Sequence, residues 1–181
     1  MAMKEGREMS DFDVFEVLDI THEVYYSRVL AWLLDPTGSH LQKKFFLKWF
    51  LKRCGISDRV KYESVTLEEE IRGAGDDPRR RVDIAVRCEG YLVYVEVKID
   101  NRSIDKLQPF EQYKLGQRRA EDEKCKFVHV FLTPDETPLK LIGEAETRLI
   151  RWAEIRDTLR ERVRVLQKKT QQQQIRTLHL C

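Results

Sequence analysis

Three residues in this sequence, Asp83, Glu96 and Lys98, have side chains whose types and spacing suit metal-ion chemistry. Glu96 and Lys98 are two apart in an extended, apolar segment, so both side chains lie on one face of the expected strand. If Asp83 lies beside them, two carboxylates face each other, and like charges so placed destabilise a sheet. A divalent metal ion with a lysine beside it would offset the repulsion between the two carboxylates and could also take part in a reaction.

A β-hairpin is the element that must position these residues. The stretch RRRVDIAVRCEGYLVYVEVK alternates between apolar and polar residues on either side of its Glu-Gly pair. Such alternation around an X-Gly pair is typical of two antiparallel strands joined by a two-residue turn. With Cys88 opposite Tyr91, counting back along both strands places Asp83 opposite Glu96. We therefore expect their Cβ atoms to lie about 4.5–5.5 Å apart.

The three arginines before the hairpin offer a structural alternative to a metal ion. Buried charges are normally paired, so Asp83 and Glu96 would then form ion pairs with Arg79–Arg81. Spacing alone leaves both interpretations open.

Two helices are expected before the hairpin. Thr21 is a suitable N-cap for a helix over His22–Leu34, whose residues are apolar on nearly all sides. The segment Asp35–Gly38 reads as a turn. Ser39 then caps a second helix over His40–Cys54, which is rich in aromatic residues.

Charged side chains on these helices have two interpretations. Glu23 lies on one stripe with Ser27, which makes it an acid on a partly apolar face, but an acid in the first turn also favours the helix dipole. Lys44, Lys48 and Lys52 recur at i, i+4 spacing. They form either a solvated face or an edge that contacts phosphates.

The remaining elements predict an α/β fold with a mixed central sheet of about five strands flanked by helices. Further strands are expected over 65–71, 126–133 and 147–152, and helices from Pro109 to about Glu121 and over 153–167. Residues 1–10 are polar and are expected to be flexible, and residues 11–167 form a single domain. The glutamine-rich tail, 168–181, loses periodicity and is expected to be disordered.

Composition places the chain among globular proteins and restricts how it could bind nucleic acid. Its 181 residues include 33 basic and 31 acidic side chains, for a net charge of +2, so any nucleic-acid affinity must come from a local patch. The four cysteines form no CxxC pair, and the first residues do not resemble a signal peptide. No apolar run is long enough to span a bilayer. We therefore expect a cytoplasmic protein with reduced thiols.

The pattern of Asp83 in RRVDIAV followed by Glu96-Val97-Lys98 in LVYVEVK resembles the signature of the PD-(D/E)XK nuclease superfamily. The segment EVYYSRVLAWLLDPTGSH, with FFLKWFL behind it, is similar to the N-terminus of one bacterial branch of that superfamily. The similarity covers roughly residues 12–162. It implies a restriction-endonuclease-like fold and metal-dependent hydrolysis of phosphodiester bonds, with DNA as the substrate. The rival on the same fold is a nucleic-acid-binding or regulatory protein that does not cleave.

The resemblance also implies roles for individual residues. Asp83, Glu96 and the backbone carbonyl of Val97 correspond to ligands of Mg²⁺ or Mn²⁺, Lys98 to the lysine that orients the attacking water, and Glu23 to a supporting acid. The glutamine of the family's Q…Y element matches Gln108, with Gln112 as a competing match. The expected nucleic-acid contacts are Tyr113, Gln112, Ser27, Lys44, Lys48, Arg79 and Arg81. The oligomeric state is left open, and a dimer is compatible with the sequence.

Overall fold

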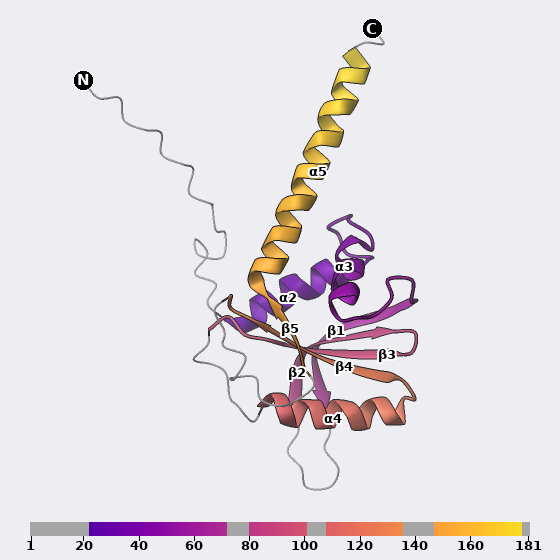
Figure 1. Cartoon of the computed structure of the whole chain (residues 1–181), viewed down its shortest axis with the longest axis vertical. Coiled ribbons are helices and arrows are strands. Elements are labelled where there is room, and N and C mark those ends of the chain that lie inside the picture. The colour runs from indigo at the N-terminus through magenta and orange to yellow at the C-terminus, as the bar shows by residue number, and fades with distance from the viewer. Residues whose placement is uncertain (1–21, 72–79, 101–107, 136–146, 179–181) are drawn as a thin grey trace, which may run out of the picture.

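A computed structural model describes residues 22–71, 80–100, 108–135 and 147–178. These form one five-stranded sheet with helices on both faces (Figure 1). In chain order the elements are α2 (Glu23–Leu34), α3 (Phe45–Arg53), β1 (Tyr62–Ile71), β2 (Arg80–Cys88), β3 (Tyr91–Val97), α4 (Gln108–Asp122), β4 (Lys126–Thr133), β5 (Thr147–Arg151) and α5 (Trp152–Leu178). Across these ranges, no helix combines the length and the apolar character needed to cross a membrane.

The sheet is mixed, as the sequence predicts. Strands β1, β2 and β3 pair antiparallel, whereas β3, β4 and β5 pair parallel, in the spatial order β1-β2-β3-β4-β5. The predicted hairpin register is confirmed, because Cys88 pairs with Tyr91. Gly90 supplies the left-handed backbone that the turn requires, with φ of +75°.

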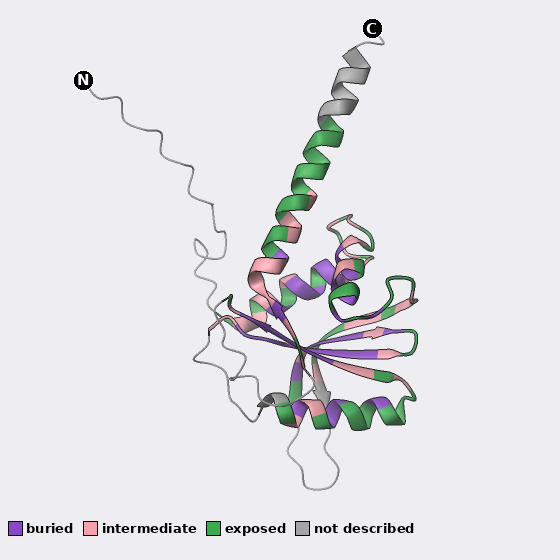
Figure 2. Ribbon diagram, in the orientation of Figure 1, coloured by how far each residue is buried: buried purple, intermediate pink, exposed green. Residues whose placement is uncertain are grey.

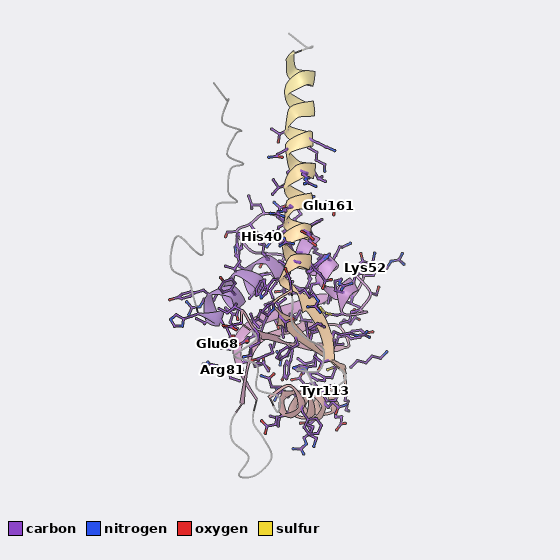
Figure 3. The ribbon with its side chains drawn as sticks, turned by 60° about the vertical axis from the view of Figure 1, so that its left-hand side comes forward. His40, Lys52, Glu68, Arg81, Tyr113 and Glu161 are labelled. Carbon is purple, nitrogen blue, oxygen red and sulfur yellow. The ribbon has the colours of Figure 1, made fainter. Side chains whose placement is uncertain are left out.

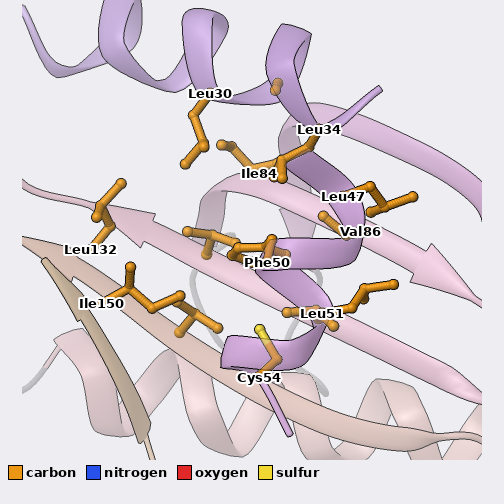
Figure 4. Close-up of a cluster of buried hydrophobic side chains, with 14 of the residues drawn as sticks. Leu30, Leu34, Leu47, Phe50, Leu51, Cys54, Ile84, Val86, Leu132 and Ile150 are labelled. Atoms are coloured by element: carbon orange, nitrogen blue, oxygen red, sulfur yellow. The ribbon is translucent and has the colours of Figure 1, made fainter. Parts of the chain in front are cut away.

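Two hydrophobic layers enclose the sheet. The larger core lies under α2, α3 and the first turns of α5, where side chains such as Leu34, Phe50 and Leu132 are almost completely buried (Figure 4). Helix α4 covers the opposite face, so Lys52 on α3 and Tyr113 on α4 lie on different sides of the sheet (Figure 3). The central strands are consequently buried along most of their length (Figure 2). This double burial explains their long runs of apolar residues.

Helix α4 approaches the sheet closely because it carries a glycine. A Cβ atom on Gly116 would overlap the ring of Phe127 in β4. The absence of a side chain at this position therefore sets the height of α4 above the sheet.

The second helix begins later than predicted, at Phe45 instead of His40. The backbone N–H of Gln42 donates to Nδ1 of His40, and the Gln42 side-chain amide donates to the His40 carbonyl. Leu41 and Lys43 have left-handed backbone, with φ of +58° and +52°, which a right-handed helix excludes. The predicted cap, Ser39, accepts a hydrogen bond from the Trp32 indole over 3.0 Å. These local side-chain bonds compete successfully with helix formation.

The last helix is longer than predicted. Helix α5 continues from Trp152 to Leu178, so the backbone of 168–178 is helical and the prediction of a disordered tail from residue 168 is wrong for this part. Glycine and proline do not occur in α5, and Lys, Gln, Arg and Leu are good helix formers. The predicted flexible residues 1–10 and residues 179–181 lie outside the described ranges.

Candidate active site

The two carboxylates of the predicted metal site meet where β2 and β3 separate. Regular pairing of these strands is described as far as Ile84 opposite Val95. Beyond that point the Oδ2 atom of Asp83 accepts a hydrogen bond from the backbone N–H of Val97 over 2.7 Å. Glu96 lies beside this bond and is only 2% exposed. The N–H and C=O of one residue in an extended strand point the same way, so the Val97 carbonyl also faces the Asp83 side.

Lys98 is buried between two acids. Its Nζ lies 2.7 Å from Oε1 of Glu96 and 3.3 Å from Oε2 of Glu23. The lysine is 6% exposed, a degree of burial that charged residues reach almost only when they are paired. Lys98 and the two glutamates therefore form one ionic cluster, supplied by the end of β3 and by α2, in which Lys98 and Glu96 are buried and Glu23 is partly exposed.

Trp152, which the sequence did not single out, holds the backbone of Lys98. The Lys98 N–H donates to the carbonyl of Leu132, which continues the parallel pairing with β4. The next donor in that ladder would come from Pro134, which has no N–H. The indole Nε1 of Trp152 donates to the Lys98 carbonyl instead, over 2.9 Å. A proline directly after a buried strand is the sequence signal that pointed to a missing donor.

Glu23 reaches the cluster from the first turn of α2. Besides its contact with Lys98, its Oε1 accepts the backbone N–H of Ile99 over 3.5 Å. The residue thus occupies the position that suits the helix dipole and also contacts Lys98, so the two interpretations of Glu23 are compatible.

Gln112 is the glutamine that contacts the carboxylates. Its Nε2 donates to Oε2 of Glu96 over 2.7 Å and to the backbone carbonyl of Arg81 over 3.3 Å. Its Oε1 is buried and has no hydrogen-bond partner within the described part of the chain. Between the two candidates, this geometry favours Gln112, and the side chain of Gln108 lies outside the described residues.

The electrostatics of the cluster favour a bound cation. Burial raises the pKa of Asp83 to about 7, and repulsion from Glu96 adds to the rise. Burial also acts to lower the pKa of Lys98, but attraction by Glu96 and Glu23 outweighs it and raises the pKa above its usual value. One lysine therefore leaves the Asp83 charge incompletely compensated.

The donor set at this position is made of oxygen atoms, which suits a hard divalent ion that keeps several waters. Asp83, Glu96 and the Val97 carbonyl provide it. Among the described residues, no three His, Cys, Asp or Glu side chains gather closely enough to hold a metal by themselves. An ion here would be held by two carboxylates, a carbonyl and water.

Other residues predicted to contact nucleic acid occupy different environments. Ser27 is buried and donates to the carbonyl of Glu23, so its hydroxyl supports the helix turn that carries that acid. The ring of Tyr113 packs against Phe127 in β4, and its hydroxyl accepts a bond from Gln117. Both side chains thus make contacts within the domain, and their contact with nucleic acid stays a prediction.

Arg81 lies next to the site but pairs elsewhere. Its guanidinium is 3.2 Å from the Glu68 carboxylate, and both side chains are exposed at the edge of the sheet (Figure 3). The predicted alternative, in which arginines neutralise Asp83 and Glu96, is therefore wrong for Arg81, and Arg79 and the side chain of Arg80 lie outside the described residues.

The lysine stripe on α3 lies towards the other end of the sheet. Lys44, the first residue of this stripe, lies close enough to Cys88 for its charge to act on that thiol. It opposes the effect of burial, which raises the pKa of Cys88 to about 11. Cys88 ends β2 at the hairpin turn, about 17 Å along the strand from Asp83 at roughly 3.4 Å per residue. Lys48 pairs with Asp58 over 3.4 Å. The structure thus does not bring Lys44 and Lys48 to the carboxylates.

Comparison with protein families matches residues 12–179 to the PD-(D/E)XK nuclease superfamily. The match covers most of the chain, and the mixed five-stranded sheet flanked by helices is consistent with a restriction-endonuclease-like domain of this superfamily. Its members are generally nucleases, which are hydrolases. None of the curated proteins and none of the solved structures compared with the chain matches it.

Proposed function

The chain belongs to the PD-(D/E)XK nuclease superfamily, and from this premise we propose that it hydrolyses phosphodiester bonds in DNA with a divalent metal ion. The observation that carries the proposal is the cluster of Asp83, Glu96 and Lys98, in which Glu96 and Lys98 are buried and Asp83 is partly buried. A surface that only binds phosphates needs cations that face solvent. Two carboxylates beside one buried lysine serve metal-assisted hydrolysis much better than they serve binding.

We assign the ion, Mg²⁺ or Mn²⁺, to the oxygens of Asp83, Glu96 and the Val97 carbonyl. When bound, such an ion lowers the pKa of a coordinated water and offsets the charge that develops on the phosphate. Gln112 fixes the orientation of the Glu96 carboxylate through its 2.7 Å hydrogen bond. Partners of this kind usually strengthen metal binding by holding a ligand in place.

Lys98 acts as a donor to the substrate. Because its pKa is raised, its ammonium group stays protonated at neutral pH, and it can donate to a phosphate oxygen or orient the attacking water. Glu23 holds the ammonium from the other side over 3.3 Å. This pair keeps the lysine at a fixed position before the substrate arrives.

The rival function is nucleic-acid binding without cleavage. It is favoured by the same ion pairs, since Lys98 neutralises part of the acidic charge without any metal. The two functions differ in what a divalent ion does, because only the nuclease requires it for turnover.

A cleavage assay with Glu96→Gln as the matched variant separates the two functions. Closed circular plasmid, linear duplex, single-stranded DNA and RNA are incubated with Mg²⁺, Mn²⁺ or EDTA. We expect the wild type to cut DNA only with metal, with nicking of the closed circle as the sign of endonuclease action, and the variant to be inactive. If the folded wild type binds these nucleic acids and cuts none of them, the proposal fails in favour of the binding-only rival.

We also propose that the protein works in the cytoplasm. The three cysteines in the described ranges, Cys54, Cys88 and Cys125, are free thiols. Free thiols are typical of a reducing compartment.

A further inference from the structure

Helix α5 begins at the active site and leaves the domain. Its first residue, Trp152, holds the carbonyl of Lys98, and Ile155 is buried in the larger core. From there the helix extends away from the sheet (Figure 1). Every side chain from Val163 to Thr170 is exposed (Figure 2). A long exposed helix that is anchored beside a catalytic lysine is well placed to contact a polymer substrate.

The exposed part of α5 concentrates the positive charge of the chain. Residues 156–170 contain six basic and two acidic side chains, so they carry a net charge of +4, whereas the whole chain carries +2. The remaining residues are therefore net negative. A local cationic surface of this kind is what a nearly neutral protein needs to bind nucleic acid.

Four of these cations lie at intervals of four residues, which is close to one helical turn. We call them the α5 stripe: Arg156, Arg160, Arg164 and Lys168. At 1.5 Å of rise per residue the stripe is about 18 Å long, and Lys168 lies about 24 Å along the helix from Trp152. Duplex DNA rises about 3.4 Å per base pair, so that distance corresponds to about seven base pairs.

Neighbouring side chains explain why the stripe faces solvent. Arg162 points towards α3, where its guanidinium stacks 4.5 Å from the Phe45 ring centre and its Nε donates to Gln42 over 2.8 Å. These contacts fix the rotation of the helix at its base. Arg164 and Lys168 make no ion pair with any residue in the described ranges, and both are exposed.

We propose that the α5 stripe binds the phosphate backbone of the nucleic-acid substrate on one side of the cleavage point. This inference rests on the proposed nuclease function and extends it, because it gives the substrate a minimum length of about seven base pairs on that side. The contacts are to phosphates, so they contribute affinity and position without sequence preference.

A helix pair between two copies of the chain is the competing explanation for an exposed helix. Val163 and Leu166 are exposed apolar residues on α5, at 51% and 36%. However, they are flanked by cations, and two helix segments of +4 each would repel when placed side by side. The charge therefore favours a polyanionic partner over a second copy.

The test compares two triple variants that remove the same charge from two exposed helical stripes. The first is Arg160→Gln, Arg164→Gln, Lys168→Gln on α5, and the matched control is Lys44→Gln, Lys48→Gln, Lys52→Gln on α3. Glutamine is a good helix former, and circular dichroism and melting temperature check the folds. Binding to a duplex of about 30 base pairs is measured in EDTA over a range of salt concentrations, so cleavage is not required.

Each lost phosphate contact reduces the slope of log affinity against log salt by about 0.9. We expect the slope of log affinity against log salt to be smaller by two to three in the α5 variant, whereas the control keeps the wild-type slope. Between about 50 mM and about 200 mM salt, wild-type affinity should then fall roughly forty-fold more than that of the variant. Equal slopes in the wild type and the α5 variant would overturn the inference, as would an equal loss in both variants.

Substrate length provides an independent readout. If the protein cleaves DNA, the α5 variant should have a lower kcat/KM on long duplexes but an unchanged value on a duplex too short to reach the stripe. A protein that binds DNA through α5 without cleaving it would refute the nuclease function but leave the phosphate contact of the α5 stripe standing. If the α5 variant binds normally and Val163→Ser, Leu166→Ser converts a dimer to a monomer, α5 is a dimer interface and the inference is wrong.

Discussion

Asp83→Asn should stabilise the metal-free protein while removing the proposed metal site. The change removes a charge but keeps an oxygen that can accept the Val97 N–H. Burial and Glu96 raise the pKa of Asp83 from 3.8 to about 7, so the folded state holds the ionised carboxylate less favourably than the unfolded chain does. A group of this kind contributes stability below pH 3.8 that is lost as the pH rises through 7.

The size of the effect follows from that pKa. One pKa unit corresponds to about 1.4 kcal/mol, so the raised pKa of Asp83 reduces the free energy of unfolding by about 4 kcal/mol at pH 8, where the folded protein holds the ionised carboxylate. At pH 5 the reduction is about 2 kcal/mol, because the carboxylate must take up a proton on folding. The pH profile of wild-type stability alone would not reveal the contribution of Asp83. Burial lowers the pKa of His129 to about 4, which removes stability as the pH falls below 6.5 and opposes the gain from Asp83.

The difference between wild type and variant isolates the Asp83 contribution. Urea unfolding in EDTA at pH 5 and pH 8 should show Asp83→Asn to be more stable, with the larger gain at pH 8. Asp58→Asn is the matched control, because its side chain is 49% exposed and pairs with Lys48 at the surface. Its stability change should stay below about 1 kcal/mol at either pH.

Excess Mg²⁺ should remove more than half of the stability difference at pH 8. At about 100 times its dissociation constant a ligand adds about 2.7 kcal/mol to the free energy of unfolding, and only the wild type should gain it. If Asp83→Asn is no more stable than wild type at pH 8, Lys98 already compensates the carboxylates. The electrostatic argument for a bound ion would then be refuted.

Three further variants test the surrounding residues. Lys98→Ala should fold and bind metal but lose two to three orders of magnitude in single-turnover cleavage, and a wild-type rate would exclude its catalytic role. Gln112→Leu should weaken Mn²⁺ binding in calorimetry about 10- to 100-fold, because Glu96 loses the donor that orients it; unchanged affinity would contradict that role. Trp152→Phe keeps an aromatic ring but leaves the Lys98 carbonyl without its donor. We expect it to lower the free energy of unfolding by about 1–3 kcal/mol in urea titrations, and an unchanged value would show that water replaces the indole.

The sequence was sufficient to predict the hairpin and its register. Period-two alternation and the Glu89-Gly90 turn depend on neighbouring residues only, so they could be interpreted without tertiary information. Once the register was known, the proximity of Asp83 and Glu96 followed by counting. These two carboxylates were therefore the most predictable part of the site.

Features that depend on distant packing could not be predicted in the same way. The choice between Gln108 and Gln112 depends on how α4 is rotated on the sheet, which its packing on β4 decides. The role of Trp152 depends on the missing N–H of Pro134, whose consequence appears only when two parallel strands are paired. The start of α3 depends on local hydrogen bonds between His40 and Gln42 and on the left-handed backbone of Leu41 and Lys43, which residue types alone do not indicate.

The close approach of α4 to the sheet makes the site sensitive to a position that contacts no substrate. Gly116 and Gln112 are four residues apart, so they lie on one face of α4. Any larger residue at 116 would have to push the helix away from Phe127, and Gln112 would then be drawn back from Glu96. In a scan of all single substitutions, we expect position 116 to rank with the metal ligands in its effect on cleavage.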